Sequence, residues 1–243
     1  MKPLGQKAYG HVAHLPGSRM GPGDHHCHEG QARIACEKAR DRHDRISVTE
    51  KCDGSCVSAA KVNGTVLALN RSGYLAQSSP YEQHQWWAYW VRLNYERFDA
   101  VLEEGERLVG EWLAQAHGTR YDLPHEPFAA FDLMLGDRRL TRDVFLAKTA
   151  VGGFVTPRLL HEGGPICVEE VLRLLEPSGH GALDPVEGAV WRVERADPRK
   201  GLYVDFLAKY VRPDKVDGSY LPELTGGDPV WNWKPAGSAA NEG

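Results

Sequence analysis

The chain has no long hydrophobic run. No apolar stretch approaches the ~20 residues that a transmembrane helix needs, which excludes a membrane-spanning protein. Its first residues, MKPLGQKAYGHVAHLPG, also lack the continuous apolar segment of a secretory signal. We therefore expect a cytoplasmic protein with no membrane association.

A large excess of charge of one sign is also absent. Lysine and arginine total 29 against 33 aspartates and glutamates, a net charge of −4, which argues against a histone-like nucleic-acid binder but allows a local basic groove. The five cysteines are an odd number in a chain too long to need disulfides, so reduced thiols are expected. With 243 residues, 42% of them hydrophobic, the chain can bury a full core.

The clearest local element is a hairpin. Residues 46–51 and 55–62 read as strands, and Asn63-Gly64 then leads into a third strand over 65–70. An Asn-Gly pair between two strand-like runs predicts a tight β-hairpin. The hairpin brings the segment EKCDGS close to NRSGY.

The rest of the chain mixes strands with a few helices. Apolar residues at helical spacing over 82–105 predict an amphipathic helix whose tryptophans pack in the core rather than stack on bases. Shorter helices are expected within 30–45 and over 166–175, and a fraying tail over 225–243. Further strands are predicted over 106–114, 127–135, 143–148, 188–195 and 201–211. These elements indicate an α+β fold with mainly antiparallel sheets.

The segment Glu50-Lys51-Cys52-Asp53-Gly54 carries the strongest chemical signal. A lysine at a strand end, just before an Asp-Gly turn, is an unusual place for a structural ammonium group. Lysine can act as a covalent nucleophile when its surroundings lower its pKa, and glycine lets the backbone turn tightly beside a ligand. Taken alone, the segment also fits a solvated lysine in a turn.

Five further short motifs follow in order. They are Asn70-Arg71-Ser72-Gly73, Val109-Gly110-Glu111-Trp112, Phe128 to Leu133 (FAAFDL), Val186-Glu187-Gly188-Ala189-Val190 and Phe206 to Tyr210 (FLAKY). With these six motifs in this order, the chain resembles the covalent nucleotidyltransferase superfamily of ATP-dependent DNA ligases, RNA ligases and mRNA-capping guanylyltransferases. The resemblance implies an ATP-grasp-like ligase adenylation domain over 46–216, preceded by an irregular and helical segment (1–45) packed on it and followed by a tail (217–243).

The resemblance also implies a role for each motif. Lys51 would attack the α-phosphorus of ATP, expel pyrophosphate and hold AMP as a phosphoramidate, with Glu50 and Gly54 beside it in the nucleotide pocket. Arg71 and Glu111 would fix the ribose hydroxyls, and the ring of Phe131 would stack on the adenine. The alternative for Phe131 is core packing, and for Glu111 an ordinary surface carboxylate.

The remaining implied residues manage charge. Glu187 and Asp53 would hold Mg²⁺, with Mn²⁺ able to substitute, because hard carboxylate oxygens suit these ions; the alternative for Glu187 is a surface carboxylate. Lys209 would neutralise charge that builds on the α-phosphate. Lys209 and a metal in one pocket would also disfavour the protonated form of Lys51, which predicts a neutral nucleophile near pH 7.

Within the superfamily, the chain is most similar to RNA ligases that seal nicks in duplex RNA. Cys56 stands where capping enzymes and DNA ligases usually carry arginine, and the 34 residues after Lys209 are too few for the OB-fold domain of those enzymes. An RNA with 5′-phosphate and 3′-hydroxyl ends is the implied partner. The closing motif lacks the second lysine of the family's K-x-K pattern, for which Arg212 or Lys215 are candidates.

Two other function classes stay open. One is a DNA ligase or another lysine nucleotidyltransferase, including one that uses GTP. The other is a catalytically inactive nucleic-acid-binding module, which the retained Lys51, Glu111, Glu187 and Lys209 argue against. The cluster Asp24-His25-His26-Cys27-His28, with Cys36 beyond it, matches no common zinc-finger spacing and is expected to be a solvated or substrate-facing loop.

Overall fold

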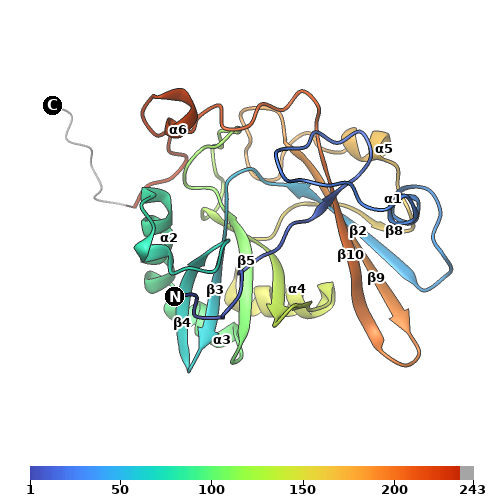
Figure 1. Ribbon diagram of the computed structural model, residues 1–243, viewed down its shortest axis with the longest axis horizontal. Coiled ribbons are helices and arrows are strands. Elements are labelled where there is room, and N and C mark those ends of the chain that lie inside the picture. The colour runs from blue at the N-terminus through green and yellow to red at the C-terminus, as the bar shows by residue number, and fades with distance from the viewer. Residues whose placement is uncertain (236–243) are drawn as a thin grey trace.

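The computed structural model describes residues 1–235 and has a mixed α+β architecture built around two five-stranded sheets (Figure 1). Sheet A has the strand order β1-β10-β9-β2-β8, and sheet B has the order β4-β3-β5-β6-β7. Among these strands β1 runs parallel to β10, and the other pairings are antiparallel. The predicted α+β class with mainly antiparallel sheets is confirmed.

Sheet B contains the predicted hairpin. Asn63 and Gly64 join β3 (Ser55–Val62) to β4 (Thr65–Asn70), and their φ angles of 51° and 71° lie in the left-handed region. A two-residue hairpin turn requires this backbone, and asparagine and glycine adopt it at least cost. The other strands of sheet B are β5 (Glu106–Trp112), β6 (Phe128–Leu135) and β7 (Arg138–Arg139).

Sheet A joins distant parts of the chain. Its strands are β1 (Ala13–His14), β2 (Asp44–Lys51), β8 (Leu159–Gly163), β9 (Gly188–Asp197) and β10 (Gly201–Val211). The N-terminal segment first lies beside sheet B, where Ala8 N donates to Arg71 O, and then crosses to the edge of sheet A as β1 (Figure 1). The N-terminal segment thus meets the strand that carries the last motif at one sheet edge.

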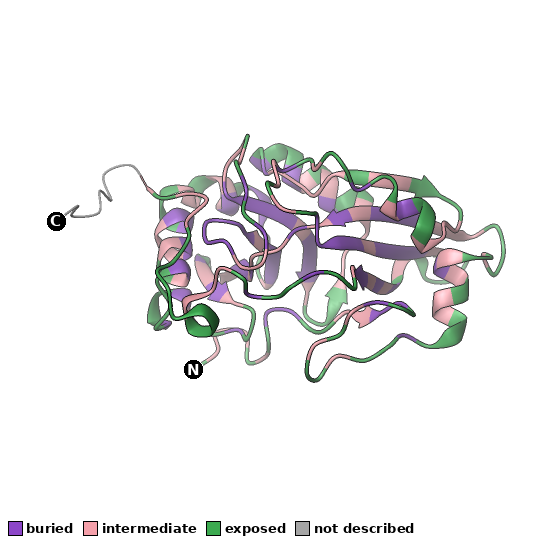
Figure 2. Cartoon of the chain, turned by 90° about the horizontal axis from the view of Figure 1, so that it is seen from above, coloured by how far each residue is buried: buried purple, intermediate pink, exposed green. Residues whose placement is uncertain are grey.

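The predicted helix over 82–105 is present but divided. α2 (Glu82–Leu93) and α3 (Tyr95–Val101) are separated at Asn94, and both pack on sheet B. Trp87 and Trp90 are buried and stack with ring centroids 5.7 Å apart, so their predicted place in the core is confirmed. In Figure 2 the buried residues, drawn in purple, gather along the strands. No helix of residues 1–235 is long and apolar enough to cross a membrane.

Three further helical elements are short. α1 (Glu29–Cys36) lies within the N-terminal segment, as predicted, and is followed by irregular chain up to β2. The helix expected over 166–175 is reduced to α5 (Val168–Leu172). A 3₁₀ turn, η1 (Ala76–Ser78), connects β4 to α2.

The strand predicted over 143–148 is wrong. This region forms α4 (Arg142–Gly152), which ends at Gly153 in the left-handed conformation. Its buried residues are Phe145, Thr149 and Gly152, a spacing of four and three that places them on one helix face. The six residues 143–148 are too few to distinguish the helical spacing of apolar residues from the alternation of a strand.

The prediction of a fraying tail is also wrong for residues 225–235; residues 236–243 lie outside the described chain. After α6 (Pro222–Thr225), Trp231 forms a β-bridge with Gln115. Asn232 Nδ2 donates to Leu113 O at 2.7 Å. The ring of Trp233 packs edge-on against Trp112. The segment is therefore part of the packed structure.

Candidate active site

A cavity of about 940 Å³ is lined by strands of both sheets. Sheet A contributes parts of β2, β9 and β10, and sheet B contributes parts of β3, β5 and β6. Most of the predicted site residues meet in its wall: Glu50, Lys51, Asp53, Gly54, Arg71, Glu111, Phe131 and Lys209. Glu187 is not part of the wall and reaches the site through Lys51.

Lys51 is the last residue of β2, and its side chain is paired with Glu187. The antiparallel register places Lys51 opposite Gly188, the first residue of β9, so Glu187 stands immediately beside it. Lys51 Nζ lies 2.6 Å from Glu187 Oε2. Strand pairing therefore unites two motifs that are 136 residues apart.

Negatively charged side chains surround Lys51. Burial lowers the pKa of Lys51, but the negative charges of Glu187, Glu111 and Asp53 outweigh it and raise the pKa above its ordinary value. Burial in turn raises the pKa of both Glu111 and Glu187 to about 7. Without a bound metal, the three carboxylates around the ammonium group thus favour the charged form of Lys51. The neutral lysine expected from the sequence includes a metal in the pocket and stays a prediction.

Asp53 is held by contacts from outside the sequence motifs. Its Oδ2 accepts a hydrogen bond from Gly118 N at 2.9 Å and lies 2.9 Å from Lys215 Nζ. Its backbone N–H donates to the hydroxyl of Tyr121 at 2.9 Å. Burial raises the pKa of Asp53, but Lys215 and Lys51 together lower it below its ordinary value, so Asp53 is ionised.

The turn after Asp53 depends on a glycine. A Cβ atom on Gly54 would lie 2.5 Å from the carbonyl oxygen of Trp112, closer than any side chain tolerates. The same close approach lets Gly54 N donate to Glu111 Oε1 at 3.1 Å. Glu111 is brought there by the pairing of β3 with β5, in which it stands opposite Cys56.

Arg71 and Phe131 also line the cavity, one after strand β4 and the other on strand β6. Arg71 follows β4, is exposed, and donates from Nη2 to Gly10 O at 3.2 Å. The Phe131 ring contacts Tyr9 edge-on, with centroids 5.2 Å apart. Phe131 is half-buried with one part facing the cavity, so it is available to a planar ligand.

Glu50 holds a neighbouring loop. It is 2% exposed and accepts hydrogen bonds from Ser178 Oγ at 2.5 Å and from Gly179 N at 2.9 Å. Arg158 Nε lies 3.5 Å from the same carboxylate. Its protein partners thus occupy both oxygens of this carboxylate, which sequence reasoning assigned to the nucleotide pocket.

The donor atoms at the site suit a divalent cation. Glu187 and Asp53 offer hard carboxylate oxygens whose buried negative charge is balanced here by Lys51 and Lys215. Within residues 1–235 no group of three or more His, Cys, Asp or Glu side chains is arranged to hold a metal, and this includes the segment around His25.

Two charged residues outside the six motifs pair with residues of those motifs. Asp24 Oδ1 lies 3.6 Å from Lys209 Nζ, and Lys215 pairs with Asp53. Lys215 had been one of two candidates for a second positive charge. Asp24 stood in a cluster that was weighed for zinc, and no local pattern links it to Lys209 because their contact depends on the pairing of β1 with β10.

Comparison with known proteins agrees with the motif order. The sequence profile of the RNA ligase family matches residues 44–211. No curated protein sequence matches the chain significantly. The match begins at the first residue of β2 and ends at the last residue of β10.

A solved RNA ligase structure shares the fold of this chain. A Naegleria gruberi RNA ligase variant, solved with ATP and manganese, superposes with a TM-score of 0.54 at 15% identity over 83% of this chain and 59% of that one. An archaeal ATP-dependent RNA ligase gives 0.42 at 21% identity over 70% and 44%. A putative ATP-dependent DNA ligase from Aquifex aeolicus gives 0.46 at 15% identity over 84% and 49%. The chain thus spans about half the length of these proteins.

Proposed function

Because the chain belongs to the RNA ligase family, we propose that it is an ATP-dependent RNA ligase that forms a covalent adenylate on Lys51. The observation that carries the proposal is the setting of Lys51. This lysine ends a strand in the wall of a cavity of about 940 Å³, and its Nζ lies 2.6 Å from a buried glutamate. The cavity wall also contains residues from the other motifs.

In the first step, Lys51 Nζ forms a bond to the α-phosphorus of ATP. The bond from that phosphorus to the bridging oxygen breaks, pyrophosphate leaves with the electron pair, and the amine loses its proton. Lys51 must first leave its ion pair with Glu187. A bound divalent cation supplies positive charge that neutralises the carboxylates and phosphates and thereby favours the neutral amine. Lys209, in the same cavity wall, offers positive charge to the α-phosphate.

The cavity wall suits the other parts of the nucleotide. Its apolar residues offer flat and aliphatic surfaces for adenine, with Phe131 as the stacking ring; they include Phe131, Phe145, Leu146, Pro157, Leu159 and Val190. Arg71 and Glu111 supply one donor and one acceptor for the ribose hydroxyls. Glu187 and Asp53 would hold Mg²⁺ or Mn²⁺.

The later steps join RNA ends. The AMP bound to Lys51 passes to an RNA 5′-phosphate, which frees the lysine and forms a pyrophosphate link between AMP and the RNA. A 3′-hydroxyl then attacks the RNA phosphorus, AMP leaves, and a phosphodiester forms.

Labelling of the protein tests the first step. We expect purified protein with Mg²⁺ and α-labelled ATP to retain label after denaturation, and Lys51→Ala to retain none. Lys61→Ala is the matched control, because Lys61 does not line the cavity. Its Nζ lies 2.7 Å from Asp99 Oδ1. GTP in parallel tests the base, and nicked RNA and DNA duplexes test the strand. Absence of label from folded wild-type protein, with either Mg²⁺ or Mn²⁺, would overturn the proposal.

A further inference from the structure

The N-terminal segment reaches the site from outside the matched region. β1 pairs with the edge of sheet A so that His14 stands beside Lys209, and Leu15 N donates to Lys209 O at 2.8 Å. The chain then turns back along β1, where His14 N donates to His25 O at 2.9 Å. Gly21 N donates to Asp24 Oδ2 at 3.0 Å. Backbone pairing on one side and a turn on the other therefore fix the position of Asp24.

A chain of side-chain contacts runs from Lys209 back to its own strand. Asp24 Oδ1 lies 3.6 Å from Lys209 Nζ, and Asp24 Oδ2 lies 2.9 Å from His14 Nε2. His14 Nδ1 and Ser18 Oγ are 2.6 Å apart, and Ser18 Oγ accepts a hydrogen bond from Val211 N at 2.9 Å. His14 is 1% exposed, so its ring cannot turn toward solvent. Both ends of this chain of contacts lie on β10.

The charge and the direction of the Lys209 side chain depend on these contacts. Among residues 1–235, Asp24 is the carboxylate within ion-pair distance of its ammonium group. Burial and the nearby positive charge of Lys51 lower the pKa of Lys209, while Asp24 raises it. The ion pair therefore favours the charged form and restricts the flexible side chain to one direction.

We propose that Asp24, held by His14, is a positioning residue for Lys209. The inference rests on the proposed function, in which Lys209 meets charge on the α-phosphate. Asp24 keeps the ammonium group charged and directed into the cavity, so it supports the chemical step more than it supports ATP binding. It also gives a role to the segment before residue 44, where the RNA ligase match begins.

Lysine adenylylation at several ATP concentrations tests the inference. We expect Asp24→Asn to lower the maximal rate about 10-fold or more while changing the ATP concentration at half-maximal rate less than about 3-fold. Asp24→Glu should recover part of the rate because it restores the charge. His14→Gln should also lower the maximal rate, but by a smaller factor than Asp24→Asn. It tests the inference if Asp24→Asn does not fold at the assay temperature.

Asp217→Asn is the matched control. Asp217 Oδ1 lies 2.6 Å from Nη1 of Arg19 in the same N-terminal segment, and Asp217 takes no part in the chain of contacts from Lys209 to Val211, so its variant should keep the wild-type rate. The inference is overturned if Asp24→Asn keeps the wild-type rate, if Asp24→Glu is as slow as Asp24→Asn, or if Asp217→Asn is equally slow. Failure of the proposed function is a different result, because wild-type protein would then take up no label.

Discussion

At the scale of single residues, the geometry behind Lys51 depends on Gly54. The carbonyl oxygen of Trp112 stands 2.5 Å from where a Cβ atom of residue 54 would lie. The contact is with backbone, so it cannot be relieved by a side-chain rotation. A larger residue must push β3 and β5 apart and move Lys51 with them.

We therefore expect Gly54→Ala to lower the free energy of unfolding by roughly 1–3 kcal/mol and to slow lysine adenylylation. Gly30→Ala is the control, because a Cβ atom at this position in α1 meets no atom within 4 Å. That variant should be as stable as wild type or slightly more stable, since alanine favours helix. Urea unfolding measures both. Equal stability of Gly54→Ala and wild type would contradict the argument.

A buried histidine has a consequence for acid stability. His180 is 2% exposed, and its Nδ1 lies 2.8 Å from His125 Nε2. Burial, with smaller effects of His125 and Arg158, lowers the pKa of His180 to about 4 from an ordinary value of 6.5. Between these pH values the unfolded chain binds a proton that the folded chain does not, so stability falls as pH decreases.

We expect this histidine to remove on the order of 1–3 kcal/mol of stability between pH 7 and pH 4. His180→Gln should lose less stability over the same range, because its side chain does not titrate. Urea unfolding of both proteins at pH 7, 5.5 and 4 measures the difference. Identical pH dependence in the two proteins would show that His180 does not contribute.

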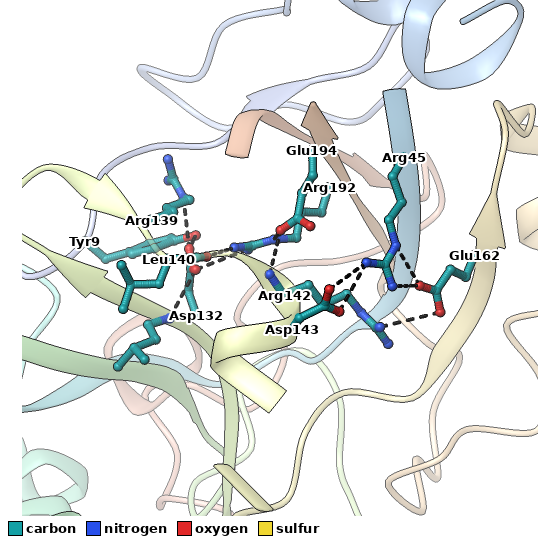
Figure 3. A network of polar contacts seen from close by, with 11 residues as sticks. Tyr9, Arg45, Asp132, Arg139, Leu140, Arg142, Asp143, Glu162, Arg192 and Glu194 are labelled. Atoms are coloured by element: carbon teal, nitrogen blue, oxygen red, sulfur yellow. Dashed lines mark hydrogen bonds and ion pairs between the residues drawn. The ribbon is translucent and has the colours of Figure 1, made fainter. Parts of the chain in front are cut away.

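At the scale of elements, a buried ionic network joins the two sheets (Figure 3). Asp132 on β6 is 0% exposed and accepts hydrogen bonds from Tyr9 Oη at 3.0 Å, Arg139 Nε at 2.9 Å and Arg192 Nη1 at 3.1 Å. Arg192 belongs to β9 and also pairs with Glu194. The aspartate next to Phe131 thus connects sheet B to sheet A and helps to set the width of the cavity between them.

Asp132→Asn should destabilise the protein by roughly 3–5 kcal/mol, because it leaves two arginines without their buried carboxylate. Asp143→Asn is the comparison: it also removes an aspartate that pairs with an arginine, Arg45, but Asp143 is 59% exposed. Its effect should stay within about 1 kcal/mol. Chemical denaturation measures the free energy of unfolding of the two variants. A similar loss of stability in both would contradict the structural role of Asp132.

At the scale of the whole molecule, the cavity is lined by residues of both sheets. Residues of both sheets line it, so a bound nucleotide should oppose the separation of one sheet from the other. A ligand that binds the folded state alone stabilises it by about 2.7 kcal/mol at 100 times its dissociation constant. The unfolding temperature therefore reports on occupancy of the cavity.

We expect ATP with Mg²⁺ to raise the unfolding temperature of Lys51→Ala, a variant in which binding is measured without reaction. Phe131→Ala in that background should reduce the shift, because the stacking ring is lost. GTP should give a smaller shift if the base is selected. An unchanged unfolding temperature with every nucleotide would remove the cavity as the nucleotide site.

Local signals were sufficient for much of the fold. The hairpin at Asn63-Gly64, the core tryptophans of α2 and the strands that carry the motifs were all predicted from neighbouring residues. Errors arose where the local signal was short or absent. Six residues did not distinguish a strand from α4, and the docking of Trp233 on Trp112 has no sequence signature.

The sequence by itself determined which residue types stand at the strand ends and in what order, because periodicity and turn chemistry act between near neighbours. It indicated the lysine at position 51 and the motifs that accompany it. Tertiary structure alone decided the charges around Lys51, the pairing of Lys215 with Asp53 and the approach of Asp24 to Lys209. These contacts join residues far apart in the chain, and they exist because strand pairing and burial bring the residues together in space.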